Sequence, residues 1–152
     1  MSRASAPVVG VVVLVSLTVL LSATVLAGLP DSTSASPPTA SLSLTVDGSA
    51  DRIELTHRGG DELDVSEMDV RISVDGDALT HQPPVPFFAA DGFKSGPDGA
   101  FNNASSNTFK AGERTTLTLA STNHPQLDAG VDVSVRITVH DSVVFDETRT
   151  VS

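Results

Sequence analysis

Hydrophobic and polar positions divide the chain into two parts with different patterns. Residues 4 to 30 form a run of 27 residues without a charged side chain. Within this run, residues 8 to 29 are long enough for an apolar helix to cross a bilayer, for which about 20 residues suffice. Because Arg3 precedes the run, the positive-inside bias predicts a cytoplasmic N-terminus and an outer location for the remainder. The pattern therefore predicts a single-pass transmembrane α-helix.

Beyond residue 40, apolar residues alternate with polar ones, which is the period of half-buried β-strands. The clearest alternation covers residues 131 to 139, and shorter examples occur at residues 42–46, 70–74 and 115–119. Asp-Gly pairs follow two of these runs and indicate turns. Since no helical stretch interrupts the strand candidates, we expect an all-β head, an antiparallel β-sandwich of immunoglobulin-like character.

The segment between these two parts has the composition of a linker. Residues 30 to 40 are rich in Ser, Thr and Pro and have no apolar periodicity. Such a segment is typically extended and flexible. The predicted organisation is therefore an apolar helix over residues 4–29, a linker over residues 30–40 and an acidic head over residues 41–152.

The charge and cysteine content of the chain exclude several classes of partner and of chemistry. The chain has 19 acidic and 9 basic residues and a formal net charge of -10, which excludes nucleic acid as a plausible partner. An acidic surface of this kind suits a very salty medium in which charge repulsion is screened. The chain has no cysteine, so disulfides, thiol catalysis and iron–sulfur clusters are excluded.

No residue pattern indicates catalysis. The four histidines lack the paired spacing of a zinc site, and the aspartates around residues 47–51 and 75–77 fit turns better than a calcium loop. The chain contains no Gly-x-Ser-x-Gly elbow, phosphate-binding glycine loop or His-Glu-x-x-His sequence. We therefore expect no enzymatic activity, no metal and no cofactor.

Residues 81 to 112 depart from the strand alternation and hold five of the six phenylalanines. These rings either complete the hydrophobic core at one end of the head or form a contact surface, and the sequence leaves both alternatives open. The same region contains Asn103, which begins the Asn-Ala-Ser sequon in a polar run where a loop is expected. Asn103 is therefore a candidate N-glycosylation site.

The start of the apolar run carries a specific motif. Its positions are Ala4, Pro7, Val8, Val9 and Gly10. The segment resembles the N-terminus of archaeal type IV pilins, particularly those of haloarchaea, in which a basic or polar residue precedes Ala-Val-Ser-Pro-Val-Ile-Gly and an apolar helix. Most positions match directly, whereas Ser5 and Ala6 replace the family's Val and Ser.

A second segment carries the same resemblance in the head. Heads of these pilins often contain a strand that ends in Thr-His-x-Gly-Gly-Asp. The corresponding positions here are Thr56, His57, Gly59, Gly60 and Asp61. Two matches in the right order favour the pilin family more than either match alone.

The resemblance implies a maturation and assembly route. A prepilin peptidase would cut after Arg3, remove a leader of residues 1–3 and leave Ala4 at the mature N-terminus. The helix would then leave the membrane lipid and, with the pilus assembly machinery, bundle with the helices of like pilin subunits in a filament core.

The expected function is that of a structural subunit, a pilin or minor pilin-like protein, of an adhesive archaeal type IV pilus. The expected location is the cell membrane for the single-pass precursor, with its head outside, and an extracellular pilus after assembly. One alternative is a membrane-anchored extracellular β-sandwich that binds a partner without polymerising, and a second is a secreted hydrolase.

Overall fold

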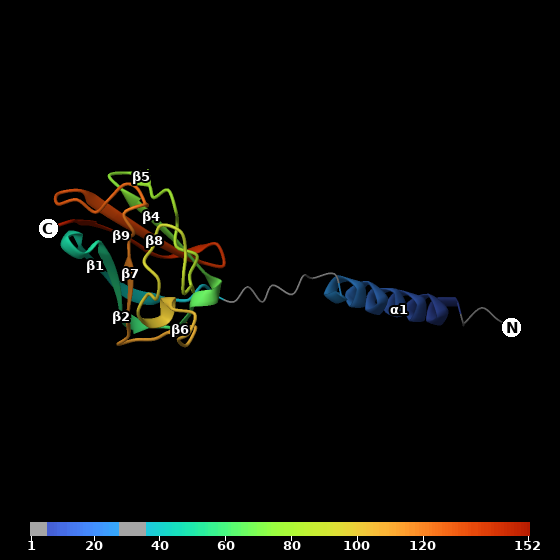
Figure 1. Cartoon of the computed structure of the whole chain (residues 1–152). Coiled ribbons are helices and arrows are strands. Elements are labelled where there is room, and N and C mark those ends of the chain that lie inside the picture. Colours follow the sequence, from blue (N-terminus) through green and yellow to red (C-terminus); the bar gives the residue numbers. More distant parts are fainter. Residues whose placement is uncertain (1–5, 28–35) are drawn as a thin grey trace. The chain divides into compact units, whose positions relative to one another are not determined.

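A computed structural model of the chain describes residues 6–27 and 36–152. The chain divides into two compact units, Met1–Ser36 and Pro37–Ser152, and each is described by itself (Figure 1). The predicted leader, residues 1–3, and most of the predicted linker lie outside the described residues.

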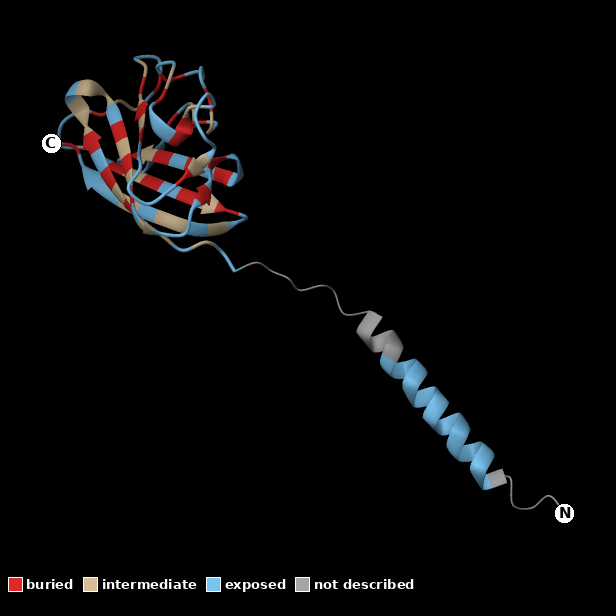
Figure 2. Ribbon diagram, turned by 90° about the horizontal axis from the view of Figure 1, so that it is seen from below, coloured by how far each residue is buried: buried red, intermediate tan, exposed pale blue. Residues whose placement is uncertain are grey.

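Helix α1 spans Ala6–Ala27 and begins in the sequence motif. Pro7 lies in the first turn, where a backbone N–H has no helical partner and its absence costs little. The hydroxyls of Ser16 and Ser22 donate to the carbonyls of Val12 and Thr18, at 2.7 and 2.8 Å. Because the helix's own carbonyls satisfy these hydroxyls, the outer surface of α1 is mostly hydrocarbon. The described side chains of α1 are all exposed (Figure 2).

The predicted membrane span is wrong for the part of the chain that the structure describes. No helix within residues 6–27 and 36–152 combines the length and apolar character needed to cross a membrane. The fold class is therefore corrected at its transmembrane helix. The predicted location of the precursor, a single-pass protein of the cell membrane, is corrected on the same finding.

The second unit is rich in β-structure, and its sheets are antiparallel. One sheet has the order β1-β2-β7, from strands β1 (Ala40–Asp47), β2 (Arg52–Gly60) and β7 (Arg114–Thr118). A second sheet has the order β5-β4-β8-β9, from β5 (Asp77–Ala78), β4 (Met68–Val74), β8 (Asp132–Val139) and β9 (Ser142–Thr150). The short strands β3 (Leu63–Asp64) and β6 (Thr108–Phe109) pair with each other. This β-rich head is compatible with the predicted β-sandwich.

Both larger sheets bury alternate side chains in one hydrophobic core. On β4 the buried positions are Met68, Val70, Ile72 and Val74, and on β8 they are the apolar residues from 133 to 139. The residues between them face outward, so buried and exposed positions alternate along the strands (Figure 2). This alternation of burial follows the alternation of apolar and polar residues in the sequence.

Four of the five phenylalanines in residues 81–112 belong to the core. The buried rings are Phe87, Phe93, Phe101 and Phe109, whereas Phe88 is 55% exposed. The ring centroids of Phe101 and Phe109 lie 6.4 Å apart, and those of Phe87 and Phe93 lie 5.8 Å apart. The first alternative, completion of the core, is therefore confirmed for these four rings.

Aspartates close the short 3₁₀ turns of the head. Asp47 accepts hydrogen bonds from the amides of Ser49 and Ala50, at 3.0 and 3.2 Å, at the start of the turn Gly48–Ala50. The Ser49 hydroxyl, which donates to the same carboxylate, lowers the pKa of Asp47 below its ordinary value. The Ser66 hydroxyl and amide lower the pKa of Asp64 in the same way. These carboxylates are used as turn caps.

Candidate functional site at the entry to the head

The head motif lies where the chain enters the folded head. It covers the end of β2, which pairs with the beginning of β1 through Gly60 and Ala40. The register shifts between Ser41 and Leu42, so Arg58 is an extra residue opposite this step. Such a bulge bends the strand, while Gly59 and Gly60 stay paired with Ser41 and Ala40 beyond it. The motif residues after the bulge can therefore turn toward the incoming chain.

Asp61 holds the residue that precedes β1. Its backbone N–H donates to the carbonyl of Thr39 at 2.8 Å, and its carboxylate Oδ2 accepts from the Thr39 amide at 2.9 Å. Both backbone polar groups of Thr39 are thus satisfied by one residue 22 positions away. The pair extends the attachment of β1 by one residue toward the linker.

The buried side chain of His57 supports this attachment. Its Nε2 lies 2.9 Å from the carbonyl oxygen of Asp61, and its side chain is fully buried. Because a carbonyl only accepts, Nε2 carries a proton and donates it to this oxygen. Within the described residues, Nδ1 has no hydrogen-bond partner. The ring meets Phe109 edge-on at 5.2 Å, so it joins the polar attachment to the aromatic core.

The two glycines of the motif have different roles. Gly60 has a φ of +94°, and a Cβ at this position would lie 2.3 Å from the carbonyl oxygen of Thr39. Gly59 has nothing within 4 Å of the same added atom. Only Gly60 is therefore required by backbone conformation and by the close approach of residue 39.

We expect Gly60→Ala to destabilise the head and Gly59→Ala to leave it nearly unchanged. The first substitution forces a side chain into positive φ and against a backbone carbonyl, at a cost of about 1–3 kcal/mol. Urea denaturation of the two variants gives the comparison. Equal losses of stability would show that residue 39 can move aside and that the attachment is not tight.

The remaining predicted residues lie in the other unit, outside the described residues or in a regular strand. Pro7, Val8, Val9 and Gly10 form the first turns of α1, which belongs to the other unit. Arg3 and Ala4 lie outside the described residues. Thr56 is a regular strand residue that pairs with Ser43 and Arg114.

Asn103 lies in an exposed turn of the head. Its backbone N–H donates to the carbonyl of Phe87 at 3.3 Å, and the neighbouring Asn102 side chain accepts from the Ala104 amide at 2.9 Å. The exposed position of Asn103 leaves its side chain accessible. Its glycosylation stays a prediction.

A groove that the sequence did not reveal crosses the outer face of the four-stranded sheet. Its volume is about 860 Å³. We use the name outer groove for the site floored by Arg71, Ser73, Ser134, Arg136, Asp146 and Thr148. Arg71 and Arg136 are direct cross-strand partners on β4 and β8. Asp69 pairs with the first arginine at 2.7 Å, and Asp146 pairs with the second at 2.6 Å.

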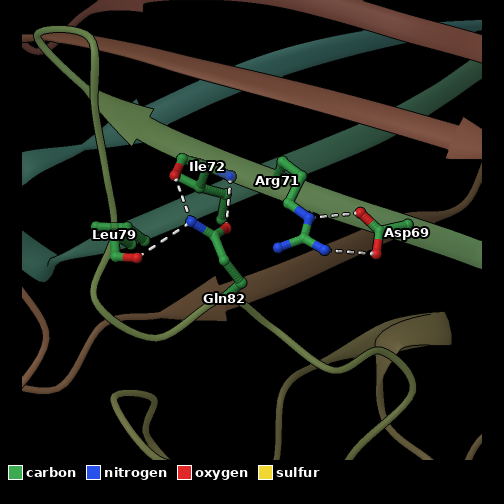
Figure 3. Close-up of polar contacts among 5 residues, drawn as sticks. All are labelled: Asp69, Arg71, Ile72, Leu79 and Gln82. Carbon is green, nitrogen blue, oxygen red and sulfur yellow. Dashed lines mark hydrogen bonds and ion pairs between the residues drawn. The ribbon is translucent and has the colours of Figure 1, made fainter.

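The side chain of Gln82 forms the wall of the outer groove. Its Oε1 accepts from the amide of Ile72 at 2.8 Å, and its Nε2 donates to the carbonyls of Ile72 and Leu79 at 2.9 and 3.2 Å (Figure 3). The side-chain amide thus bonds to the edge of β4 as the peptide of a neighbouring strand would. Three hydrogen bonds fix the segment that borders the groove.

Comparison with known proteins places the chain in a family. The chain matches no protein-family model. It is 31% identical over 117 residues to an uncharacterized protein of Archaeoglobus fulgidus, and the match covers 75% of this chain and 71% of that protein. The chain belongs to the same family as this archaeal protein. Membership in this family assigns no activity, because the relative is itself uncharacterized.

The described residues of this family member offer no metal centre. Across residues 6–27 and 36–152, no group of three or more His, Asp or Glu side chains is placed to hold a metal ion. What the geometry offers instead is a firmly held chain entry and an open polar groove. The sequence contained one signal for the chain entry, the paired glycines before Asp61. It contained no signal for the groove, because the groove depends on strand register.

Proposed function

We propose that this archaeal family member is a structural subunit of a type IV pilus, a pilin or minor pilin-like protein that mediates surface adhesion. In this proposal it assembles through α1 with like subunits, and the β-rich head is an immunoglobulin-like β-sandwich displayed on the filament. The observation that carries the proposal is the surface of α1, which is uncharged and exposed on every side along residues 7–22.

A helix that is apolar all round is stable in water only when other groups cover it. The large apolar side chains of α1 are between 54% and 67% exposed. Each Val or Leu that becomes buried contributes about 1.5–3 kcal/mol. Roughly ten such side chains outweigh the 4–15 kcal/mol that association costs. Contact with several copies of α1 would cover all sides of the helix. A partner that contacts only one side would leave the rest exposed.

Small residues on α1 support close contact between copies. An added Cβ at Gly10 finds nothing within 4 Å, so this position offers an open backbone surface. Ser16 and Ser22 present little bulk, and their hydroxyls are already bonded to helix carbonyls. Small positions of this kind let helix backbones approach one another.

The attachment at Thr39 supports the same proposal. A head carried on a filament is held only by the chain that enters it. Asp61, His57 and Gly60 secure that chain to the core through two hydrogen bonds, one buried ring and one close backbone approach. The resemblance of this motif to that of pilin heads adds to the argument.

The N-terminus of sheared surface filaments tests maturation and filament membership together. We expect mass spectrometry to find Ala4 as the first residue, because the resemblance implies cleavage by a prepilin peptidase after Arg3. Arg3→Glu should block this cleavage, whereas Lys94→Glu, a charge reversal at an exposed head position, should not. Filament subunits that still begin with Met1 would overturn the proposal.

A second candidate function is a β-sandwich binding protein that does not polymerise. The outer groove favours it, since a binding protein needs such a surface and a purely structural subunit does not. Electron microscopy of the purified chain without its first three residues separates the two, because only the pilin proposal expects filaments.

A further inference from the structure

We propose that the outer groove binds an acidic polysaccharide, with sugar carboxylates held by Arg71 and Arg136 and sugar hydroxyls held by the neighbouring Ser and Thr side chains. This inference rests on the proposed function, because it names what the adhesive head binds. Nothing in the sequence motifs or in the archaeal relative assigns this surface.

The first step is the placement of the two arginines. Arg71 and Arg136 lie directly opposite each other on neighbouring antiparallel strands. Their Cβ atoms are therefore about 5 Å apart, and like charges at this spacing repel. Each has its own carboxylate, Asp69 or Asp146, but these ion pairs are exposed and contribute little stability. The four charges sum to zero, so a further anion would be held through the N–H donors that these pairs leave unused.

The second step is the number of unused donors. A guanidinium group has five N–H donors. Arg71 and Arg136 bond their acids through Nε and Nη2, at distances from 2.6 to 3.2 Å. The Nη1 atom of each makes no hydrogen bond to any residue that the structure describes. Figure 3 shows the third nitrogen of Arg71 on the side of Gln82, away from Asp69. These donors favour a ligand rich in acceptors, above all a carboxylate.

The third step is the floor beside the arginines. Ser134 pairs with Ser73 on one side and with Thr148 on the other, and its hydroxyl lies 2.7 Å from that of Thr148. The hydroxyls thus cross three strands at a spacing of about 4.8 Å. Hydroxyls both donate and accept, as sugar hydroxyls do. Among the described residues, no aromatic side chain lines the groove, and Ile72, Ala78 and Leu79 line it beside the polar floor. The polar floor itself suits a charged sugar chain.

The fourth step concerns an acidic peptide that would bind along the β4 side of the groove. A peptide gains affinity at a sheet by adding a strand to an open edge. On this side of β4, the side-chain amide of Gln82 already bonds to the backbone N–H and to the carbonyl of Ile72. The same three hydrogen bonds hold the groove wall in place before a ligand arrives, which lowers the entropy lost on binding. A sugar chain lying on the face needs no edge.

The net charge of the chain sets the conditions for binding. A protein of charge -10 repels a polyanion over long distances. At 1 M salt the Debye length is about 3 Å, so this repulsion is screened while contacts at hydrogen-bond distance persist. Binding is therefore expected in a salty medium.

Isothermal titration of the full chain with polygalacturonate in 1 M NaCl tests the inference. We expect the wild type to bind polygalacturonate and not dextran, an uncharged polysaccharide. The double variant Arg71→Ala/Arg136→Ala should bind at least tenfold more weakly. Arg114→Ala is a matched control, because Arg114 is 65% exposed and paired with Glu54, as Arg71 is 64% exposed and paired with Asp69. The control should bind as the wild type does.

A second double variant, Arg71→Lys/Arg136→Lys, covers the case in which loss of both arginines impairs folding. It keeps the charge but loses the forked donors, so we expect an affinity below that of the wild type. Failure of the wild type to bind, equal binding of dextran, or equal affinity of the folded variants would overturn the inference. A change in self-association without a change in binding would instead identify this face as a contact between copies. Because the titration does not depend on N-terminal cleavage, its failure is distinguishable from failure of the pilin proposal.

Discussion

Leu14→Asp is expected to abolish filament formation. Leu14 is 67% exposed on α1, and the proposed assembly buries it among like helices. A carboxylate buried without a partner costs several kcal/mol and is repeated in every subunit. Electron microscopy of cells that express this variant should therefore find no filaments that contain it.

Two controls make the assembly result specific. Ala111→Asp adds the same charge at an exposed position of the head, and Leu14→Ile keeps the apolar surface of α1. Both should assemble normally. Filaments of normal abundance with Leu14→Asp would exclude α1 as the assembly element, whatever the role of the head.

Phe109→Ala is expected to give the largest loss of head stability. Phe109 is fully buried on β6 and touches both His57 and Phe101. Removing such a ring from a core costs about 3–5 kcal/mol. Domains of this size are stable by about 5–15 kcal/mol in total, so the variant should be partly unfolded or close to it. Urea denaturation followed by far-UV circular dichroism measures the change.

Phe88→Ala is the matched control for this substitution. It removes the same side chain from the same region, but Phe88 is 55% exposed and should change the free energy of unfolding by no more than about 0.5 kcal/mol. Equal losses for the two variants would mean that Phe88 is also covered in solution. In that case part of residues 81–112 would act as a contact surface after all.

Sequence periodicity located the long strands because each has one buried face. Residues 42–46, 70–74 and 131–139 alternate strictly and lie in or next to β1, β4 and β8. Strands β3, β5 and β6 have two residues each, which is too short for any period to be visible. Strand β9 alternates poorly because its pairing with β8 shifts between Ile137 and Thr138.

Both candidate sites bring together residues that lie far apart in the sequence, and no local sequence pattern predicts such contacts. Arg71 meets Arg136 only because β4 and β8 pair in one register, and a shift of one residue in either strand would place the two side chains on opposite faces of the sheet. The motif around His57 could be recognised in the sequence. Its contact with Thr39 could not be predicted from it. The membrane span was predicted from the length of the uncharged apolar run, and no helix among the described residues meets that prediction.

The hydrogen bonds between Asp61 and Thr39 have a mechanical consequence. If a surface-bound head is pulled through its linker, the tension enters at Thr39 and runs into β1 along the strand axis. Strand β1 has eight register partners on β2, from Gly60 to Arg52, and a pull in this direction loads them in shear. The load is then shared along the whole strand instead of opening one bond after another. Thr39 and Asp61 are the pair at which this tension enters the folded head, and their two hydrogen bonds add to the set that resists it.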